Sequence, residues 1–234
     1  MKKETLKKTE YIVAAVLTLA VLSVCVYQLR FGIDVQDTAS YITKFRYFFK
    51  KGTGGNALYY LLGEFFGSLI YHVVPTLYAL NAAGLIVWAV TGILIYRIMR
   101  PYLSILPLTM AVLGGLGFSA SWVRCVNWNA WSMLFLTLGM IFLLNGFDTG
   151  KKNWFYLAGL ILGWNTFTRM PNIIFLGLVA AVFYYYIGEG WKPALSGCWK
   201  MTAGGIIAGV TGCIFSIIFL GMDKFLADIG WLLG

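Results

Sequence analysis

The sequence predicts an all-α, polytopic membrane helix bundle with about seven transmembrane helices and two amphipathic juxtamembrane helices between the first and the second. Of the 234 residues, 60% are hydrophobic and 12% are charged, whereas about a quarter of the residues of a soluble domain are charged. Apolar runs of roughly 20 residues, enough to cross a bilayer, recur along the chain. No polar linker interrupts them, so residues 1–234 are expected to form a single transmembrane domain.

The first span is expected at about residues 11–29, after a basic tail at residues 1–10. Its apolar run is long and lacks a clear small-residue cleavage site, which favours an uncleaved span over a signal peptide. The remaining apolar runs predict spans at about residues 73–96, 102–120, 129–144, 154–166, 173–187 and 201–220. A tail at residues 221–234 follows the last of them.

The long connection at residues 30–71 predicts two helices that are too short or too charged to span. In the first, apolar residues recur at helical spacing while basic residues occupy the other faces: Tyr41, Ile42, Phe45, Phe48 and Phe49 against Lys44, Arg46, Lys50 and Lys51. This pattern favours a helix that lies in the membrane interface. The run Gly52-Thr-Gly-Gly55 breaks it, and a second apolar helix follows with Glu64 as nearly its only charge.

Lysine and arginine residues in the short loops set the expected orientation. With the N-terminus in the cytoplasm, the inner segments carry most of them: Lys2, Lys3, Lys7, Lys8, Arg97, Arg100, Lys151, Lys152, Lys192 and Lys200. Residues 30–71 and 221–234 are then extracytoplasmic, and the expected location is the plasma (inner) membrane. The net charge of +9 reflects topology and contact with anionic membrane lipids, so nucleic acid is not expected as a partner.

A pair of carboxylates, Asp34 and Asp37, follows the first span directly, in a chain with only nine acidic residues. One of them could act as a general base, and both could hold a divalent cation or substrate. The alternative is structural. Asp37 would then cap the helix that begins near Thr38, and Asp34 would simply be solvated.

This order of parts resembles the GT-C superfamily of membrane glycosyltransferases, which includes the protein O-mannosyltransferases and the aminoarabinose transferases. Their N-terminal module carries two juxtamembrane helices in its first outer loop, with an acidic motif just after the first span. Asp34 and Asp37 stand where that motif would be, although the common signature is an adjacent acidic pair. The segment Gly55-Asn-Ala-Leu-Tyr-Tyr-Leu-Leu-Gly63 is similar to the one that opens the second juxtamembrane helix, and Thr168-Arg-Met-Pro-Asn172 resembles an arginine-proline turn of some members.

The resemblance implies a glycosyltransferase that moves a sugar from a polyprenyl-phosphate-linked donor to an acceptor on the extracytoplasmic face. Asp34 or Asp37 would activate the acceptor, and a divalent cation would be the cofactor if one is needed. Members of the superfamily usually continue for further spans. The resemblance therefore also implies that this chain is an N-terminal module, completed by a further membrane or soluble polypeptide, or a truncated or minimal member.

Two arginines in expected outer loops, Arg169 and Arg124, oppose the usual distribution of positive charge. A guanidinium can bind a lipid phosphate through two parallel hydrogen bonds, which makes both candidates for substrate binding. Alternatively, Arg169 snorkels at the interface and caps carbonyls near Pro171. The tryptophans around Arg124 favour an aromatic belt over a sugar-stacking platform: Trp122, Trp128 and Trp131.

His72 and Glu64 complete the set of candidate substrate-binding residues. His72 is the only histidine and is expected at the outer start of the second span. There it could ligate a metal ion together with Asp34 and Asp37, assist proton transfer, or serve only structure. Glu64 either lines the site or pairs with an outer-face arginine or lysine.

A function of another class is also consistent with the sequence: a non-enzymatic membrane protein such as a transporter, a lipid-flippase component or an assembly partner. Transporters usually place ionisable residues within the membrane. The interiors of the expected spans are almost free of such residues. This pattern favours surface chemistry on a lipid-linked substrate over translocation.

Overall fold

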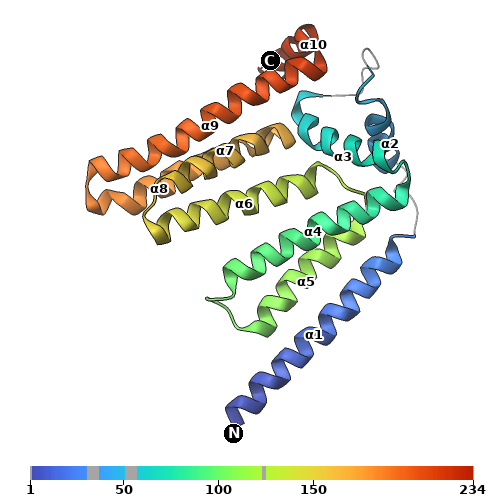
Figure 1. The fold of residues 1–234 in the computed structure, drawn as a ribbon, viewed down its shortest axis with the longest axis vertical. Helices are drawn as coiled ribbons and strands as arrows, with labels where there is room; N and C mark the ends of the chain where they lie inside the picture. The colour runs from blue at the N-terminus through green and yellow to red at the C-terminus, as the bar shows by residue number, and fades with distance from the viewer. Residues whose placement is uncertain (1, 31–36, 51–56, 123–124, 234) are drawn as a thin grey trace.

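A computed structural model describes residues 2–30, 37–50, 57–122 and 125–233, and the regular structure in these ranges is helical. Figure 1 shows an elongated bundle with the two termini at opposite ends. The predicted all-α membrane bundle is therefore confirmed. The apolar helices of the bundle are α1 (Lys2–Gln28), α4 (Leu77–Met99), α5 (Ile105–Trp122), α6 (Trp128–Thr149), α7 (Asn153–Thr168), η2 (Met170–Leu178) with α8 (Val179–Tyr186), and α9 (Trp191–Leu220).

The expected number of about seven spans is too high. Within the described residues, five segments are long and apolar enough to cross a membrane: Lys8–Gln28, Leu77–Met99, Trp128–Thr149, Met170–Glu189 and Trp191–Leu220. The apolar part of α5, Ile105–Phe118, is shorter. The 16 residues of α7 rise only about 24 Å, which is less than the ~30 Å hydrocarbon core. The chain is thus a multi-pass membrane protein with about five full spans and two shorter helices packed among them.

The two juxtamembrane helices lie where the sequence places them, between the first and second spans. They are α2 (Asp37–Tyr47) and α3 (Leu61–Val73), and a short 3₁₀ turn, η1 (Leu58–Tyr60), leads into α3. The second span begins at Leu77 and not at residue 73, because Pro75 disfavours helix in the residue before it. Thr76 then caps α4 by accepting a hydrogen bond from the Ala79 N–H at 3.2 Å.

Two further boundaries differ from expectation at the C-terminal part of the chain. Helix α9 starts at Trp191, ten residues before the expected limit, directly after Gly190 with φ 115°. Pro193 lies in its first turn, where proline is tolerated, and lysines there can snorkel out of the apolar layer. The expected tail folds as α10 (Met222–Leu233) after Gly221, whose φ of 83° ends α9.

The core of the α6–α9 half is built on close contact between α7 and α9. A Cβ added to Gly159 would collide with the backbone carbonyl of Met201, and one added to Gly204 with the carbonyl of Tyr156. Only glycine allows this approach, which is how small residues drive helix association in membranes. Around the contact, the buried side chains of this half form one apolar cluster that includes Phe155, Leu162, Val182 and Met201.

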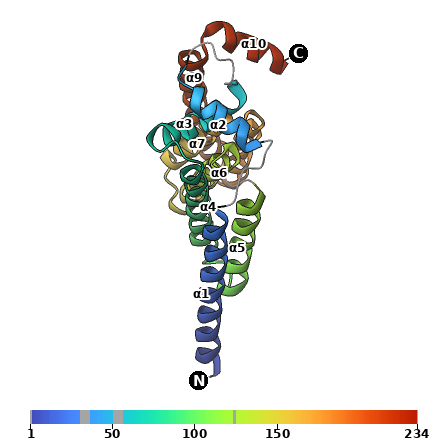
Figure 2. The same ribbon diagram turned by 90° about the vertical axis from the view of Figure 1, so that its right-hand side faces the viewer.

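The other half of the bundle consists of α1, α4 and α5. Figures 1 and 2 both show α1 lying along α5 at the N-terminal end of the molecule. The α2–α3 pair connects this half to the rest, because Tyr41 and Phe45 pack with Leu80 of α4 and Ala130 of α6. We call the opposite end the α3–α10 end, since α2, α3, η1, α10 and the turn between α7 and η2 gather there (Figures 1 and 2).

Candidate functional site

The side chains proposed from sequence for catalysis lie outside the described part of the chain. Asp34 and Arg124 lie outside the described residues. Asp37 is the first residue of α2, and its side chain also lies outside the described part. The roles assigned to these three residues, including a metal site at Asp34 and Asp37, therefore remain predictions. Among the described residues, no group of three His, Cys, Asp or Glu side chains is arranged to hold a metal ion.

Arg169 is part of a row of cations and aromatic rings at the α3–α10 end. Its guanidinium lies 4.7 Å from the centre of the Trp128 ring. Trp128 stacks on Tyr60, with 4.9 Å between ring centres and 18° between planes. The ammonium of Lys44 lies 5.6 Å from the centre of the Tyr60 ring. We call Lys44, Tyr60, Trp128 and Arg169 the cation–aromatic row; it joins α2, η1, α6 and the α7–η2 turn.

The local backbone explains why Arg169 presents its side chain to the outside. Arg169 has extended φ and ψ of −158° and 113° between α7 and η2, as expected two residues before Pro171 breaks the helix. Its N–H donates to the Asn165 carbonyl at 3.2 Å, and its carbonyl accepts from the Asn172 N–H at 2.9 Å. The turn is thus held from both sides while the Arg169 side chain stays exposed.

A buried polar cluster fixes this turn to α6. The Asn172 side-chain amide donates to Ser132 Oγ at 2.6 Å and to Asn165 Oδ1 at 3.1 Å. Within the described chain, Asn165 Nδ2 and the hydroxyls of Thr166 and Thr168 are buried without a hydrogen-bond partner. Each such atom costs about 1–3 kcal/mol. The last turn of α7, directly before Arg169, therefore carries buried polar side chains that lower the stability of the fold.

Trp128 is positioned by the start of α6. Asn127 caps this helix, since its Oδ1 accepts a hydrogen bond from the Ala130 N–H at 3.0 Å. Trp128 is the first residue of α6 and is half-buried. One face of its ring lies against Tyr60, and Arg169 lies over the ring as well. Sequence reasoning assigned Trp128 to an aromatic belt, whereas the structure makes it the centre of the row.

Glu64 orders the other end of the row. Its Oε1 lies 2.7 Å from the Lys44 ammonium, and the carboxylate is 1% exposed. Burial raises the pKa of Glu64, and the charge and hydrogen bond of Lys44 oppose that rise without cancelling it. Of the two roles expected for Glu64, the structure shows pairing with a lysine. Through that pair Glu64 holds Lys44 against Tyr60.

His72 lies apart from the row. It stands in the last turn of α3, eight residues after Glu64, which is about 12 Å along the helix. It is not at the start of the second span, because α3 ends at Val73 and α4 begins at Leu77. Its Nδ1 lies 2.8 Å from the Ser68 carbonyl, so this nitrogen must carry the proton. The ring is exposed and meets Phe49 edge-on.

Sequence reasoning missed three members of this arrangement, namely Lys44, Tyr60 and Asn172. Lys44 was one of several basic residues on an amphipathic face, and Tyr60 was one of two adjacent tyrosines. Neither carries a local signal that separates it from its neighbours. Asn172 does carry one: it is an amide directly after Pro171 and directly before the apolar run at residues 173–187, where an unpaired polar side chain would be costly.

The fold and this site define a helical multi-pass membrane protein with a cation–aromatic row at one end of its bundle. The exposed apolar helices place membrane lipids in contact with the chain. Comparison with protein-family models, with curated proteins and with solved structures finds no match to this chain.

Proposed function

We propose that this protein is a GT-C-like membrane glycosyltransferase, or the N-terminal module of one. It moves a sugar from a polyprenyl-phosphate-linked donor to an acceptor at the extracytoplasmic face, where the α3–α10 end lies. A divalent cation is the cofactor if the reaction needs one.

The observation that carries the proposal is the placement of Arg169. This exposed guanidinium lies over Trp128, in the cation–aromatic row whose other end is Lys44 of α2. Asp37 begins α2 seven residues before Lys44, which is about 10 Å along the helix. A guanidinium of the kind that binds phosphate, a stacking face and the first residue of α2, a scarce aspartate, therefore support transfer from a lipid phosphate at this end.

In the proposed reaction, Arg169 binds the phosphate of the donor and offsets the charge that grows on it. Asp34 or Asp37 accepts the proton of the acceptor hydroxyl. The acceptor oxygen then forms a bond to the anomeric carbon of the sugar, while the bond from that carbon to the phosphate oxygen breaks. Polyprenyl phosphate leaves with the electron pair, and the glycosylated acceptor is the product.

The test is a transfer assay with a radiolabelled polyprenyl-phosphate sugar and the purified protein in proteoliposomes, with Mg²⁺ or Mn²⁺ or with chelator. Asp34→Asn or Asp37→Asn is expected to lower kcat at least about 100-fold, the usual contribution of a general base. Arg169→Gln is expected to lower kcat and raise KM, and Arg169→Lys to restore part of the loss. Arg97→Gln, at the other end of α4, is the matched control and should leave transfer unchanged.

Full transfer activity in both aspartate variants would refute the catalytic role. If the wild-type protein transfers no lipid-linked sugar, alone or with a co-expressed polypeptide, the proposal that it is a glycosyltransferase is refuted. In that case a non-enzymatic role in lipid movement or assembly would remain.

A further inference from the structure

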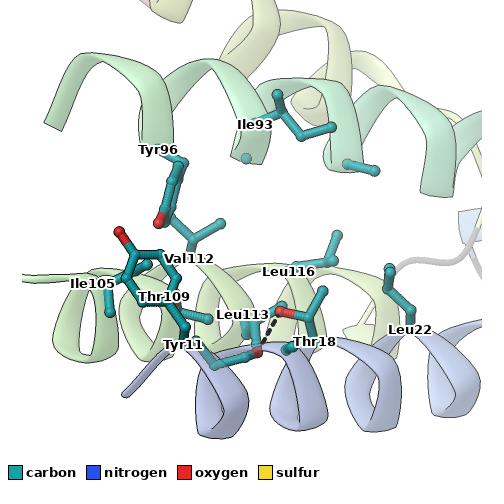
Figure 3. Close-up of a pocket in the computed structure, with 14 residues that line it drawn as sticks. Tyr11, Thr18, Leu22, Ile93, Tyr96, Ile105, Thr109, Val112, Leu113 and Leu116 are labelled. Carbon is teal, nitrogen blue, oxygen red and sulfur yellow. Dashed lines mark hydrogen bonds between the residues drawn. The ribbon is translucent and has the colours of Figure 1, made fainter. Parts of the chain in front are cut away.

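A cavity of about 490 Å³ lies between α1, α4 and α5 (Figure 3). This volume falls within the 300–1,000 Å³ range of small-molecule sites. Its walls are mostly aliphatic, with Leu22, Ile93 and Leu116 among the residues that line it. The hydroxyl of Thr18 in the wall already donates to the Ala14 carbonyl at 2.8 Å. The cavity is partly open, and its apolar lining favours a hydrocarbon occupant over water.

The shape of the cavity matches one leaflet of a bilayer. Figure 3 shows Tyr11 and Tyr96 side by side at one end and Leu22 at the other. The 11 residue steps from Tyr11 to Leu22 rise about 16 Å along α1. This distance is half of the ~30 Å hydrocarbon core. A single acyl chain of one leaflet therefore fits the cavity along its length.

The tyrosine end of the cavity is polar and basic. Arg100 follows α4 directly, four residues after Tyr96 of the cavity wall, and its guanidinium donates a hydrogen bond to the Leu103 carbonyl at 3.1 Å, in the turn that leads to α5. Lys8 and Arg97 are exposed near the same end, against Glu10 as a nearby carboxylate on α1. A basic rim above an apolar channel is complementary to a phosphate above an acyl chain.

We propose that this cavity binds one acyl chain of an anionic phospholipid from the leaflet at the N-terminal end, with the lipid phosphate on Arg100. The bound lipid fills the space between α1 and α4 and so completes the packing of this half of the bundle. The site lies at the opposite end from Arg169. It stands on its own contacts, independent of the glycosyltransferase proposal.

Photocrosslinking in nanodiscs tests where the acyl chain of the bound lipid lies. Phosphatidylglycerol with a diazirine at the terminal carbon of one acyl chain is expected to label peptides around Leu22 and Leu116. The same lipid with the diazirine near the glycerol is expected to label peptides around Tyr11 and Tyr96. Labels without this order in depth, or spread over exposed residues of α9 such as Ile207 and Ile214, would show surface lipid only and overturn the proposal.

Native mass spectrometry of delipidated protein tests whether Arg100 binds the lipid phosphate and whether the cavity holds the acyl chain. Arg100→Gln is expected to weaken retention of phosphatidylglycerol about fivefold, the contribution of one basic residue near the membrane surface. Arg97→Gln is the control and should change retention less. Ala89→Leu fills part of the cavity and is expected to reduce retention at an unchanged elution volume.

Equal effects of the two arginine variants, or retention of phosphatidylcholine equal to that of phosphatidylglycerol, would overturn the role of Arg100. Wild-type retention in Ala89→Leu would overturn the cavity as the site. Tight binding of polyprenyl phosphate without retention of phosphatidylglycerol would also contradict the proposed occupant. Neither measurement depends on transfer activity.

Discussion

Helices α7 and α9 approach so closely that a methyl group on Gly159 or Gly204 would collide with the facing backbone. Helices α1 and α4, in the other half, leave a cavity of about 490 Å³ between them. Glycines are present in both halves, and Gly114 and Gly115 of α5 have open space where a side chain would go. Glycine content alone therefore does not bring helices together. What matters is whether the glycine faces a helix or faces lipid.

This difference has an energetic meaning in a membrane. Lipid chains are as apolar as leucine, so helix association depends on contact density and not on exclusion of water. The α6–α9 half gains that density from its own residues. The α1–α4–α5 half lacks it along the cavity, and a lipid chain would supply it.

The largest effect is expected for Gly204→Leu in the dense half. The added side chain meets the Tyr156 carbonyl, and a backbone group cannot move aside as a side chain can. We expect a loss of at least ~3 kcal/mol in the free energy of unfolding, at the upper end of overpacking costs. Reversible unfolding in SDS-containing mixed micelles, followed by tryptophan fluorescence, would measure it.

Gly115→Leu is the matched control in the other half, because nothing lies within 4 Å of the position of its added Cβ. It should be neutral or slightly stabilising, since glycine in a helix interior costs about 0.5–1 kcal/mol relative to alanine. Equal losses in the two variants would contradict the comparison.

Much of the fold follows from composition and periodicity. The helical class and the two helices α2 and α3 were predicted, because apolar spacing and the glycine break at residues 52–55 are local signals. The span count was not, since α5 and α7 are apolar but their apolar parts are too short for full spans. Helix α10 was missed because its packing through Phe225 on Leu58 and Phe167 joins residues far apart in sequence.

The candidate site was predicted less well than the fold. Arg169 stood out because a lone arginine in an expected outer turn opposes the charge rule. The rest of the cation–aromatic row did not stand out, because Trp128, Tyr60 and Lys44 come together only through tertiary packing. Asp34, Arg124 and the side chain of Asp37 lie outside the described residues, so these predictions still await a test.

The α2–α3 pair, which connects the two halves, contains an ion pair between Lys44 and the buried Glu64. Lys44→Met leaves the Glu64 carboxylate, which is 1% exposed, without its cation. We expect a loss of about 2–3 kcal/mol, somewhat below the cost of breaking a fully buried pair because Lys44 is partly exposed. The same SDS titration measures it. The double variant Lys44→Met/Glu64→Leu should recover most of the loss, and its failure to do so would show that Lys44 acts through Tyr60 instead.

Glu64 also predicts a pH dependence of stability. Burial raises its folded-state pKa, so the folded protein binds this proton more tightly than the unfolded chain does. The stability that this proton provides is complete below the unfolded pKa of about 4.3 and is lost as the pH rises through the folded pKa. Relative to Glu64→Gln, the wild type should thus gain stability as the pH falls from 8 towards 4. A constant difference between the two proteins, or the opposite slope, would contradict the raised pKa.

The last comparison makes the same substitution, alanine to leucine, once in each half. In delipidated protein, Ala89→Leu places apolar atoms in the cavity and is expected to add about 1 kcal/mol to the free energy of unfolding, as cavity filling commonly does. Ala208→Leu adds the same atoms to a position that is 0% exposed and faces Gly163, so it should destabilise by about 1–3 kcal/mol. Opposite signs in parallel SDS titrations would establish that the halves differ in packing. Because the acyl chain and the larger side chain of the Ala89→Leu variant would compete for one space, added phosphatidylglycerol should stabilise the wild type more than this variant. Stabilisation of both proteins by the same amount would place the lipid elsewhere.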